Sequence, residues 1–165
     1  MPSIAPPAHT RGSHTTDDWI TPRWLIERLG PFDLDPCASV NQPWPCADDS
    51  FVRHGLDLSW GRWFVWMNPP YKRPAIEKFL EKMAAHDHGI ALIFARTETK
   101  MFFDHVWPKA SALLFLRGRL TFCYPDGTGS KAGHNSGGPS VLIGYGALAV
   151  KRLQAAQDLG KLVLL

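Results

Sequence analysis

Short apolar runs alternate with amphipathic stretches along the middle of the chain. Residues 62–67 and 89–95 are apolar runs of strand length, and the second is uninterrupted, which is typical of a strand buried on both faces. Between them, apolar residues recur at helical spacing and predict an amphipathic helix over 74–86. The apolar face of this helix consists of Ile76, Phe79, Leu80 and Met83. Strand, helix and strand in this order indicate a parallel α/β sheet.

The flanking sequence predicts further short elements. Thr21 as N-cap, Pro22 at the first helical position and Gly30 as the stop signal predict a short helix. Two more helices are expected at 100–106 and 147–157. Further strands are expected at 32–35, 112–116, 117–122, 139–144 and 162–165, with 117–122 as a possible hairpin strand and 162–165 as an edge strand. An irregular loop is expected at 37–50.

Composition fits a single small domain with a moderate positive charge. The chain has 165 residues, of which 45% are hydrophobic, so it can build one core. Residues 1–16 predict a flexible leader, the domain is expected to cover 17–165, and a Gly-rich loop is expected at 125–139. The net charge of +3 and the pI near 8.9 favour a polyanionic partner.

Cysteine and histidine usage argues against disulfides and metal centres. The three cysteines form no C-x-x-C pair and leave an odd count, which indicates a reduced, cytoplasmic setting. Of the seven histidines, His86 and His88 close a predicted helix and complement its negative end, and His9, His14 and His134 lie in expected loops, so no metal site is expected. No apolar run approaches 18 residues and no secretory signal is visible, so we expect neither export nor membrane spanning.

The tetrapeptide at 68–71, Asn-Pro-Pro-Tyr, follows the first apolar strand directly. Two prolines remove backbone donors from this loop, and the residue before a proline is held in extended geometry, which places Asn68 at the end of the strand. Its side-chain oxygen and a loop carbonyl can accept from an exocyclic amino group, and Tyr71 can stack on the attached ring. The alternative is an ordinary turn followed by a packing tyrosine.

A second polar position follows the strand at 32–35. Ligands of open parallel sheets bind beyond the carboxyl ends of the strands. Asp35 is therefore placed to bind a cationic amino group or ribose hydroxyls. The alternative is a turn carboxylate that accepts from local backbone N–H groups.

Several blocks along the chain carry a resemblance to a known family: 21–25, 34–38, 55–56 with 59–60, 66–71, 95–99, 102–103, 117–122 and 139–140. Taken in order, these blocks resemble the phage-type DNA N6-adenine methyltransferases, relatives of the Dam enzymes. The resemblance covers the chain from about residue 17. It implies a Rossmann-like class I methyltransferase fold with helices on both faces of a mostly parallel sheet, S-adenosylmethionine as methyl donor, and adenine in double-stranded DNA as acceptor. It also implies a protein encoded by a phage or prophage and active in a bacterial host cell.

The same resemblance implies roles for individual residues. Asn68, Pro69, Pro70 and Tyr71 match the catalytic motif. Asp35 would hold the amino group or nearby hydroxyls of the donor, and Thr21 and Pro22 would close the donor pocket. The full donor-binding set comprises Thr21, Pro22, Asp35, Pro36, Cys37, Asp57 and Asn68.

Two departures from the family pattern leave alternatives open. His54 stands where an acidic residue is usual, so Asp48, Asp49 or Asp57 would contact the adenosine, and Ser39 stands where a glycine is expected. A catalytically silent DNA-binding module of the same fold is therefore one alternative. A cytosine N4 methyltransferase is another, although cytosine enzymes of this class more often carry Trp than Tyr at position 71.

Residue types indicate a mechanism without a protein base. The target base would be flipped out of the duplex and stacked on Tyr71. Asn68 is a neutral amide, so it would orient the amine for direct attack on the sulfonium methyl, and the proton would leave to water. Phosphate contacts are expected from Lys72, Arg73, Arg96, Arg117, Arg119 and Lys131, although each of these could also be a solvated surface charge.

Overall fold

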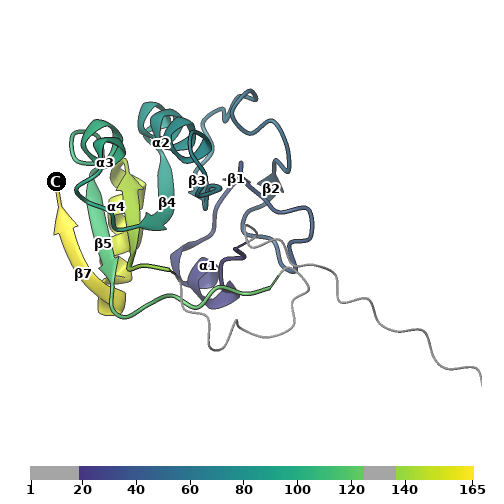
Figure 1. Ribbon diagram of the computed structural model, residues 1–165. Coiled ribbons are helices and arrows are strands. Elements are labelled where there is room, and N and C mark those ends of the chain that lie inside the picture. The colour runs from purple at the N-terminus through teal and green to yellow at the C-terminus, as the bar shows by residue number, and fades with distance from the viewer. Residues whose placement is uncertain (1–18, 125–136) are drawn as a thin grey trace, which may run out of the picture.

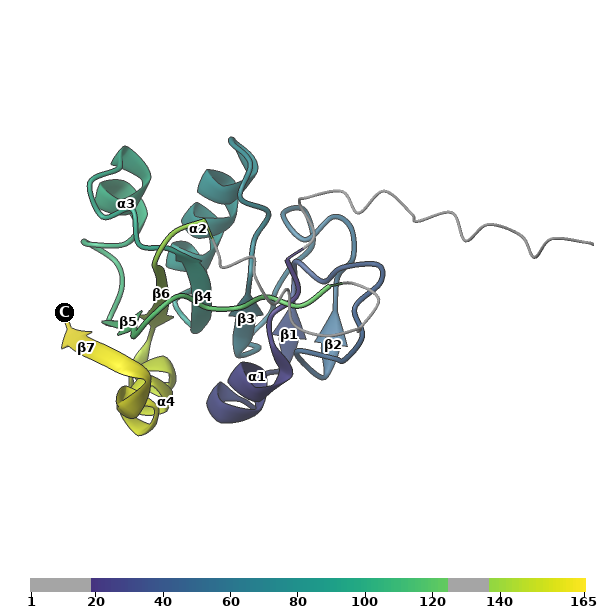
Figure 2. The ribbon, with the colours of Figure 1, turned by 60° about the horizontal axis from the view of Figure 1, so that its bottom comes forward.

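The apolar run after residue 88 forms β4 (Gly89–Phe94), a central strand of a seven-stranded sheet in the computed structural model, which describes residues 19–124 and 137–165. The strand order is β2-β1-β3-β4-β6-β5-β7 (Figure 1 and, with β6 labelled, Figure 2). The other strands are β1 (Leu34–Asp35), β2 (Asp49–Ser50), β3 (Val65–Met67), β5 (Ala112–Leu116), β6 (Ser140–Tyr145) and β7 (Gly160–Leu164). The helices are α1 (Arg23–Leu29), α2 (Ala75–His86), α3 (Lys100–His105) and α4 (Ala147–Ala155), followed by the 3-10 turn η1 (Gln157–Leu159).

Helices cover both faces of the sheet, as predicted. In β3, Val65 and Met67 face the core under α2 and α3, while Trp66 faces the core under α1 and α4. Figure 2 shows the two helix pairs on opposite sides of the strands. The four residues of the predicted apolar face of α2 are all buried, and each contributes about 1.5–3 kcal/mol by burial. Pattern alone therefore identified α2, β3 and β4.

Strand directions correct the prediction of a mostly parallel sheet. The pairings β1 with β2, β1 with β3 and β3 with β4 are parallel, whereas the three pairings that involve β6 or β7 are antiparallel. The described sheet is mixed. An apolar run reads the same in both directions, so the pattern of β6 carries no information on its orientation.

The topology brings several strand ends to one edge. Because β6 is antiparallel to both β4 and β5, the strands β4 and β5 point the same way. The carboxyl ends of β1, β3, β4 and β5 therefore share an edge. Along the chain β1 is followed by β2, which pairs with one side of β1, and then by β3, which pairs with the other side. Such a switch point opens a crevice for ligands at this edge.

Three local predictions were wrong. Thr21 is not the N-cap of α1, because Pro22 occupies that position and the Thr21 hydroxyl contacts Asn68 instead. The expected loop at 37–50 contains β2, whose two exposed polar residues give no strand pattern. Residues 117–122 form no strand: Gly118 turns the chain at φ +72°, and the isolated bridge of Cys123 with Ile20 lies just beyond the segment.

Three further features concern the cysteines, the helices and two of the predicted segments. All three cysteines are free thiols. Of the described helices, none combines the length and apolar character that crossing a bilayer requires. The expected leader at 1–16 and most of the expected Gly-rich loop, residues 125–136, lie outside the described residues.

Candidate active site

A cavity of about 250 Å³ opens at the switch point between β1 and β3. Its size is close to the lower end of ligand pockets, about 300 Å³. Four segments line it, and they come together only in the fold: residues 19–21, 35–39, 52–55 and 68–70, with Gln42, Cys46, Trp66 and Phe79 completing the wall. The strand ends after β1 and β3 therefore share one hollow, as the sequence predicted.

Asn68 lies at the end of β3 with its side chain fixed in one orientation. Its Nδ2 donates to the carbonyl of Trp19 at 2.7 Å and to Thr21 Oγ1 at 3.3 Å. On the opposite side, Asn68 Oδ1 accepts from the hydroxyl of Tyr71 at 3.1 Å. An amide oxygen has two lone pairs, so one acceptor position is left for a further donor.

Tyr71 supports this asparagine. Its hydroxyl also lies 3.4 Å from the carbonyl of Leu92, and its ring packs on Phe94 with centroids 4.7 Å apart. Burial of the ring raises the pKa of Tyr71, so the hydroxyl stays protonated and remains a donor. The contacts of Tyr71 within the protein thus include both a packing partner and the candidate catalytic residue.

Asp35 is a buried carboxylate at the cavity wall, with 3% of its surface exposed. Its Oδ1 accepts from the backbone N–H of Cys37 at 3.0 Å, which is the local turn contact considered from the sequence. Desolvation by burial raises the pKa of Asp35 to about 6, while hydrogen bonds from Cys37 and Gln42 lower it. No Lys, Arg or His of the described segments forms an ion pair with it. Near neutral pH the cavity therefore contains a negative charge that a cation would stabilise.

Trp66 also lines the cavity, from β3. Its indole N–H is buried and has no hydrogen-bond partner among the described residues. The indole N–H is closed off from solvent, so it belongs to the packed core behind the cavity wall.

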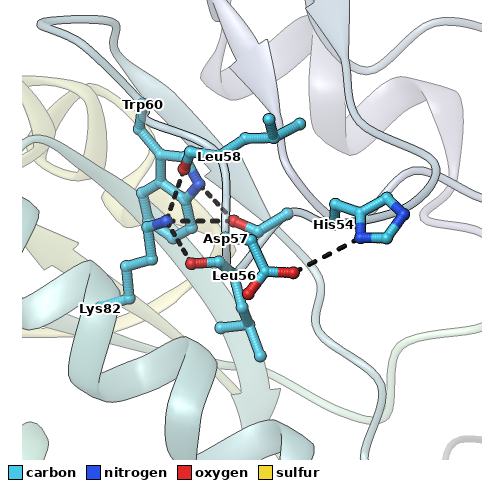
Figure 3. A network of polar contacts seen from close by, with 7 residues as sticks. His54, Leu56, Asp57, Leu58, Trp60 and Lys82 are labelled. Atoms are coloured by element: carbon cyan, nitrogen blue, oxygen red, sulfur yellow. Dashed lines mark hydrogen bonds and ion pairs between the residues drawn. The ribbon is translucent and has the colours of Figure 1, made fainter.

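The loop at 54–60 closes one side of the cavity and is held by Lys82 of α2 (Figure 3). The Lys82 ammonium donates to the carbonyls of Leu56 at 2.7 Å and Leu58 at 2.6 Å. It also lies 4.9 Å from the ring centroid of Trp60, whose Nε1 donates to the carbonyl of Gly55 at 2.8 Å. The sequence offered no signal for this role of Lys82, because its partners are backbone carbonyls more than 20 residues away.

Gly55 is required by a close approach of two cavity segments. A Cβ at this position would lie 2.0 Å from the carbonyl oxygen of Pro36. Only glycine allows the loop at 54–60 to touch the turn after β1. A steric requirement therefore explains the glycine in the Gly-Leu block at 55–56.

The predicted donor-binding residues divide into two groups. Five of them line the cavity: Thr21, Asp35, Pro36, Cys37 and Asn68. Pro22 is buried as the N-cap of α1, outside the lining. Asp57 is exposed and contacts His54 Nδ1 at 3.4 Å, whereas His54 itself lines the cavity.

The predicted catalytic residues also differ in their positions. Asn68, Pro69 and Pro70 line the cavity, and Tyr71 lies behind Asn68. Trp19 and Gln42 were not predicted. Trp19 acts through its backbone, which a sequence pattern does not identify. Gln42 lies in a segment that showed no periodicity.

Candidate phosphate-binding residues lie near the same sheet edge. Arg96 follows β4 and Arg117 follows β5, so the topology puts both at the edge that carries Asn68, and both are exposed. Lys72 and Arg73 follow the Asn-Pro-Pro-Tyr loop directly, and Arg73 forms an exposed ion pair with Glu77 at 3.4 Å. Arg119 is exposed in the segment after β5, and Lys131 lies outside the described residues. Throughout 19–124 and 137–165, no three His, Cys, Asp or Glu side chains gather as metal ligands.

Comparison with known proteins assigns the chain to a family. The model of the family described as DNA N-6-adenine-methyltransferase (Dam) matches residues 8–152. The chain belongs to this family. The match includes every residue that lines the cavity.

Two phage proteins are similar to the chain. A DNA N-6-adenine-methyltransferase of Escherichia phage T1 is 30% identical over 122 residues, which are 67% of this chain and 51% of the relative. A DNA N-6-adenine-methyltransferase of Haemophilus phage HP1 is 23% identical over 135 residues, 77% of each protein. The chain thus spans about half the length of the phage T1 relative. No solved structure matches the chain.

Proposed function

We propose that this chain is an S-adenosylmethionine-dependent DNA methyltransferase that modifies the N6 amino group of a flipped-out adenine. The observation that carries the proposal is the pairing of Asn68 and Asp35 on one cavity. An oriented amide oxygen lies at the end of β3, and a buried carboxylate without a cation lies at the end of β1. Membership of the Dam family and similarity to two phage enzymes support the choice of adenine in DNA.

The fold supports a class I, Rossmann-like assignment. Doubly wound sheets bind their ligands at the switch point beyond the carboxyl ends of the strands, and the cavity lies there. Helices on both faces and the parallel half β2-β1-β3-β4 agree with this architecture.

The residues of the wall fit the methyl donor. Asp35 would accept from its amino group. Thr21, Pro36 and Cys37 would complete the pocket. When bound, S-adenosylmethionine supplies an electrophilic methyl group on a sulfonium sulfur.

Asn68 would then orient the base. Its free acceptor position takes one hydrogen of the exocyclic amine, and a loop carbonyl takes the other. This geometry draws the nitrogen lone pair out of the aromatic ring. Asn68 cannot take a proton because it is a neutral amide, so the proton leaves to water.

DNA would bind across the sheet edge that carries these residues. Arg96 and Arg117 would contact phosphates there, together with Lys72, Arg73, Arg119 and Lys131. The enzyme would act in the cytoplasm of a bacterial host, as expected of a protein with phage relatives.

The decisive experiment is product identification. The protein is incubated with labelled donor and unmethylated DNA, which is then digested to nucleosides. Detection of N6-methyladenine supports the proposal. Detection of N4-methylcytosine would show that cytosine, and not adenine, is the methyl acceptor. No product, together with no thermal shift on adding the donor, would identify a silent DNA-binding module. The matched control is Asn68→Ala, which is expected to abolish transfer while leaving the fold and donor binding largely intact.

A further inference from the structure

Two oxygens in one short segment accept from the amide nitrogen of Asn68, and the Trp19 carbonyl determines how the amide is oriented. Trp19 contributes a backbone carbonyl at 2.7 Å and Thr21 contributes Oγ1 at 3.3 Å, both to Asn68 Nδ2. A carbonyl oxygen can only accept, so the nitrogen of the amide must face Trp19. A flipped amide would place two acceptors in contact and lose the bond.

The opposite end of the amide is consequently presented to the site. Asn68 Oδ1 accepts from Tyr71 and has a second lone pair available. An amide whose nitrogen donates strongly is polarised, which strengthens its oxygen as an acceptor. The two bonds to the segment at 19–21 therefore act on the oxygen that would bind the target amine.

The segment itself is held in place from two sides. Trp44 Nε1 donates to the carbonyl of Thr21 at 3.0 Å, and the backbone N–H of Cys123 donates to the carbonyl of Ile20 at 2.9 Å. Thr21 is 97% buried, with 3% of its surface exposed. Its hydroxyl therefore has a fixed position relative to β3.

We infer that Thr21 is a positioning residue for methyl transfer: with the Trp19 carbonyl it sets the amide of Asn68 so that Oδ1 faces the target amine. This inference rests on the proposed function and adds a second role to the pocket closure expected for Thr21. It also explains why an amide stands at position 68 of this chain. A carboxylate there would set an oxygen against the Trp19 carbonyl.

The first test compares two substitutions at position 21 in the full chain. Thr21→Val keeps the shape and removes the acceptor, whereas Thr21→Ser keeps the acceptor. Loss of one hydrogen bond predicts a fall in kcat of about three- to tenfold for Thr21→Val, with a smaller change in the KM for DNA. Thr21→Ser is expected to retain most of kcat. Wild-type kcat in Thr21→Val, or equal losses in both variants, would overturn the inference.

The second test does not depend on activity. The chain has three asparagines, Asn41, Asn68 and Asn135, and the side-chain amide signals of Asn68 in a proton–nitrogen spectrum are assigned with Asn68→Ala. They are expected to exchange with water more slowly than those of exposed Asn41, and one of them is expected to shift in Thr21→Val and not in Thr21→Ser. Fast exchange in the wild type, or no shift in Thr21→Val, would contradict the positioning role. If the wild type transfers no methyl group while the spectra behave as expected, the proposed function fails and the positioning of the amide stands.

Discussion

The hydroxyl of Tyr71 donates to Asn68 Oδ1 at 3.1 Å, so the last residue of Asn-Pro-Pro-Tyr holds the first. The sequence predicted Tyr71 as a stacking surface for the base. In the fold its ring packs on Phe94 and its hydroxyl contacts the candidate catalytic amide. The motif is thus a small hydrogen-bonded unit as well as a loop that presents carbonyl groups.

Tyr71→Phe tests this bond directly. The ring and its contact with Phe94 are retained, and one hydrogen bond to Asn68 is lost. We expect kcat to fall about three- to tenfold while the free energy of unfolding changes by less than about 1.5 kcal/mol. Methyl-transfer kinetics and thermal unfolding measure both quantities. Tyr71→Ala also removes the ring and is expected to be slower still, and unchanged kcat in Tyr71→Phe would contradict the role of the hydroxyl.

Asn68→Asp is predicted to be a disruptive change despite its similar shape. The carboxylate would face the Trp19 carbonyl across 2.7 Å without a hydrogen to share. An unsatisfied buried acceptor costs about 1–3 kcal/mol, so the variant is expected to lose thermal stability and at least fivefold in kcat. Asn41→Asp, at an exposed position, is the control and should change neither quantity. Full activity of Asn68→Asp would show that the amide orientation is unimportant.

Gly55→Ala probes the contact of the cavity loop with the turn after β1. The new methyl group would lie 2.0 Å from the Pro36 carbonyl, so one of the two segments must move. We expect a loss of about 2–3 kcal/mol in the free energy of unfolding and weaker donor binding. Gly137→Ala is the matched control, because nothing lies within 4 Å of its added carbon. Equal melting temperatures of the two variants would refute the steric argument.

Asp35 is predicted to make stability depend on pH. Its pKa rises from 3.8 to about 6 on folding. Below pH 3.8 the carboxyl group is protonated in both states. Between pH 3.8 and about 6 only the unfolded chain releases the proton, so the free energy of unfolding falls as the pH rises. Above about pH 6 this loss of stability is complete, at roughly 3 kcal/mol.

Asp35→Asn removes this titration. The variant is expected to have a higher melting temperature than wild type at neutral pH, and the difference between the two is expected to be smaller in acid. Donor affinity of the wild type is expected to rise as pH increases through about 6, where the carboxylate forms, and to stay low and flat in the variant. Calorimetric titration across this range measures the affinity. Asp87→Asn, at an exposed position after α2, is the control. Parallel pH curves for wild type and Asp35→Asn would rule out the proposed contact.

Salt dependence tests the DNA-binding edge. Arg96→Gln and Arg117→Gln each remove one charge from the edge that carries Asn68. Each is expected to reduce the slope of log affinity against log salt by about 0.9, with little change in donor binding. Arg62→Gln, before β3 and hence near the opposite edge, is the control. An equal effect of all three substitutions would place DNA elsewhere on the surface.

The sequence alone determined the elements that depend on local pattern. The apolar face of α2, the buried strand β4 and the position of Asn68 after β3 follow from residues that are neighbours in the chain. The crevice at the ends of β1 and β3 was also predicted, because parallel strands present their carboxyl ends at one edge.

Only the tertiary structure decided the orientation of β6 and the partners of Asn68, Tyr71 and Lys82. An apolar run has the same pattern in either direction, so the sequence does not indicate that β6 lies antiparallel between β4 and β5. The bonds of Asn68 to Trp19 and Thr21 span 49 and 47 residues and use a backbone carbonyl and a hydroxyl. Hydrophobic periodicity records which face of an element is buried, whereas the hydrogen-bond partners at the site depend on how distant segments meet in space.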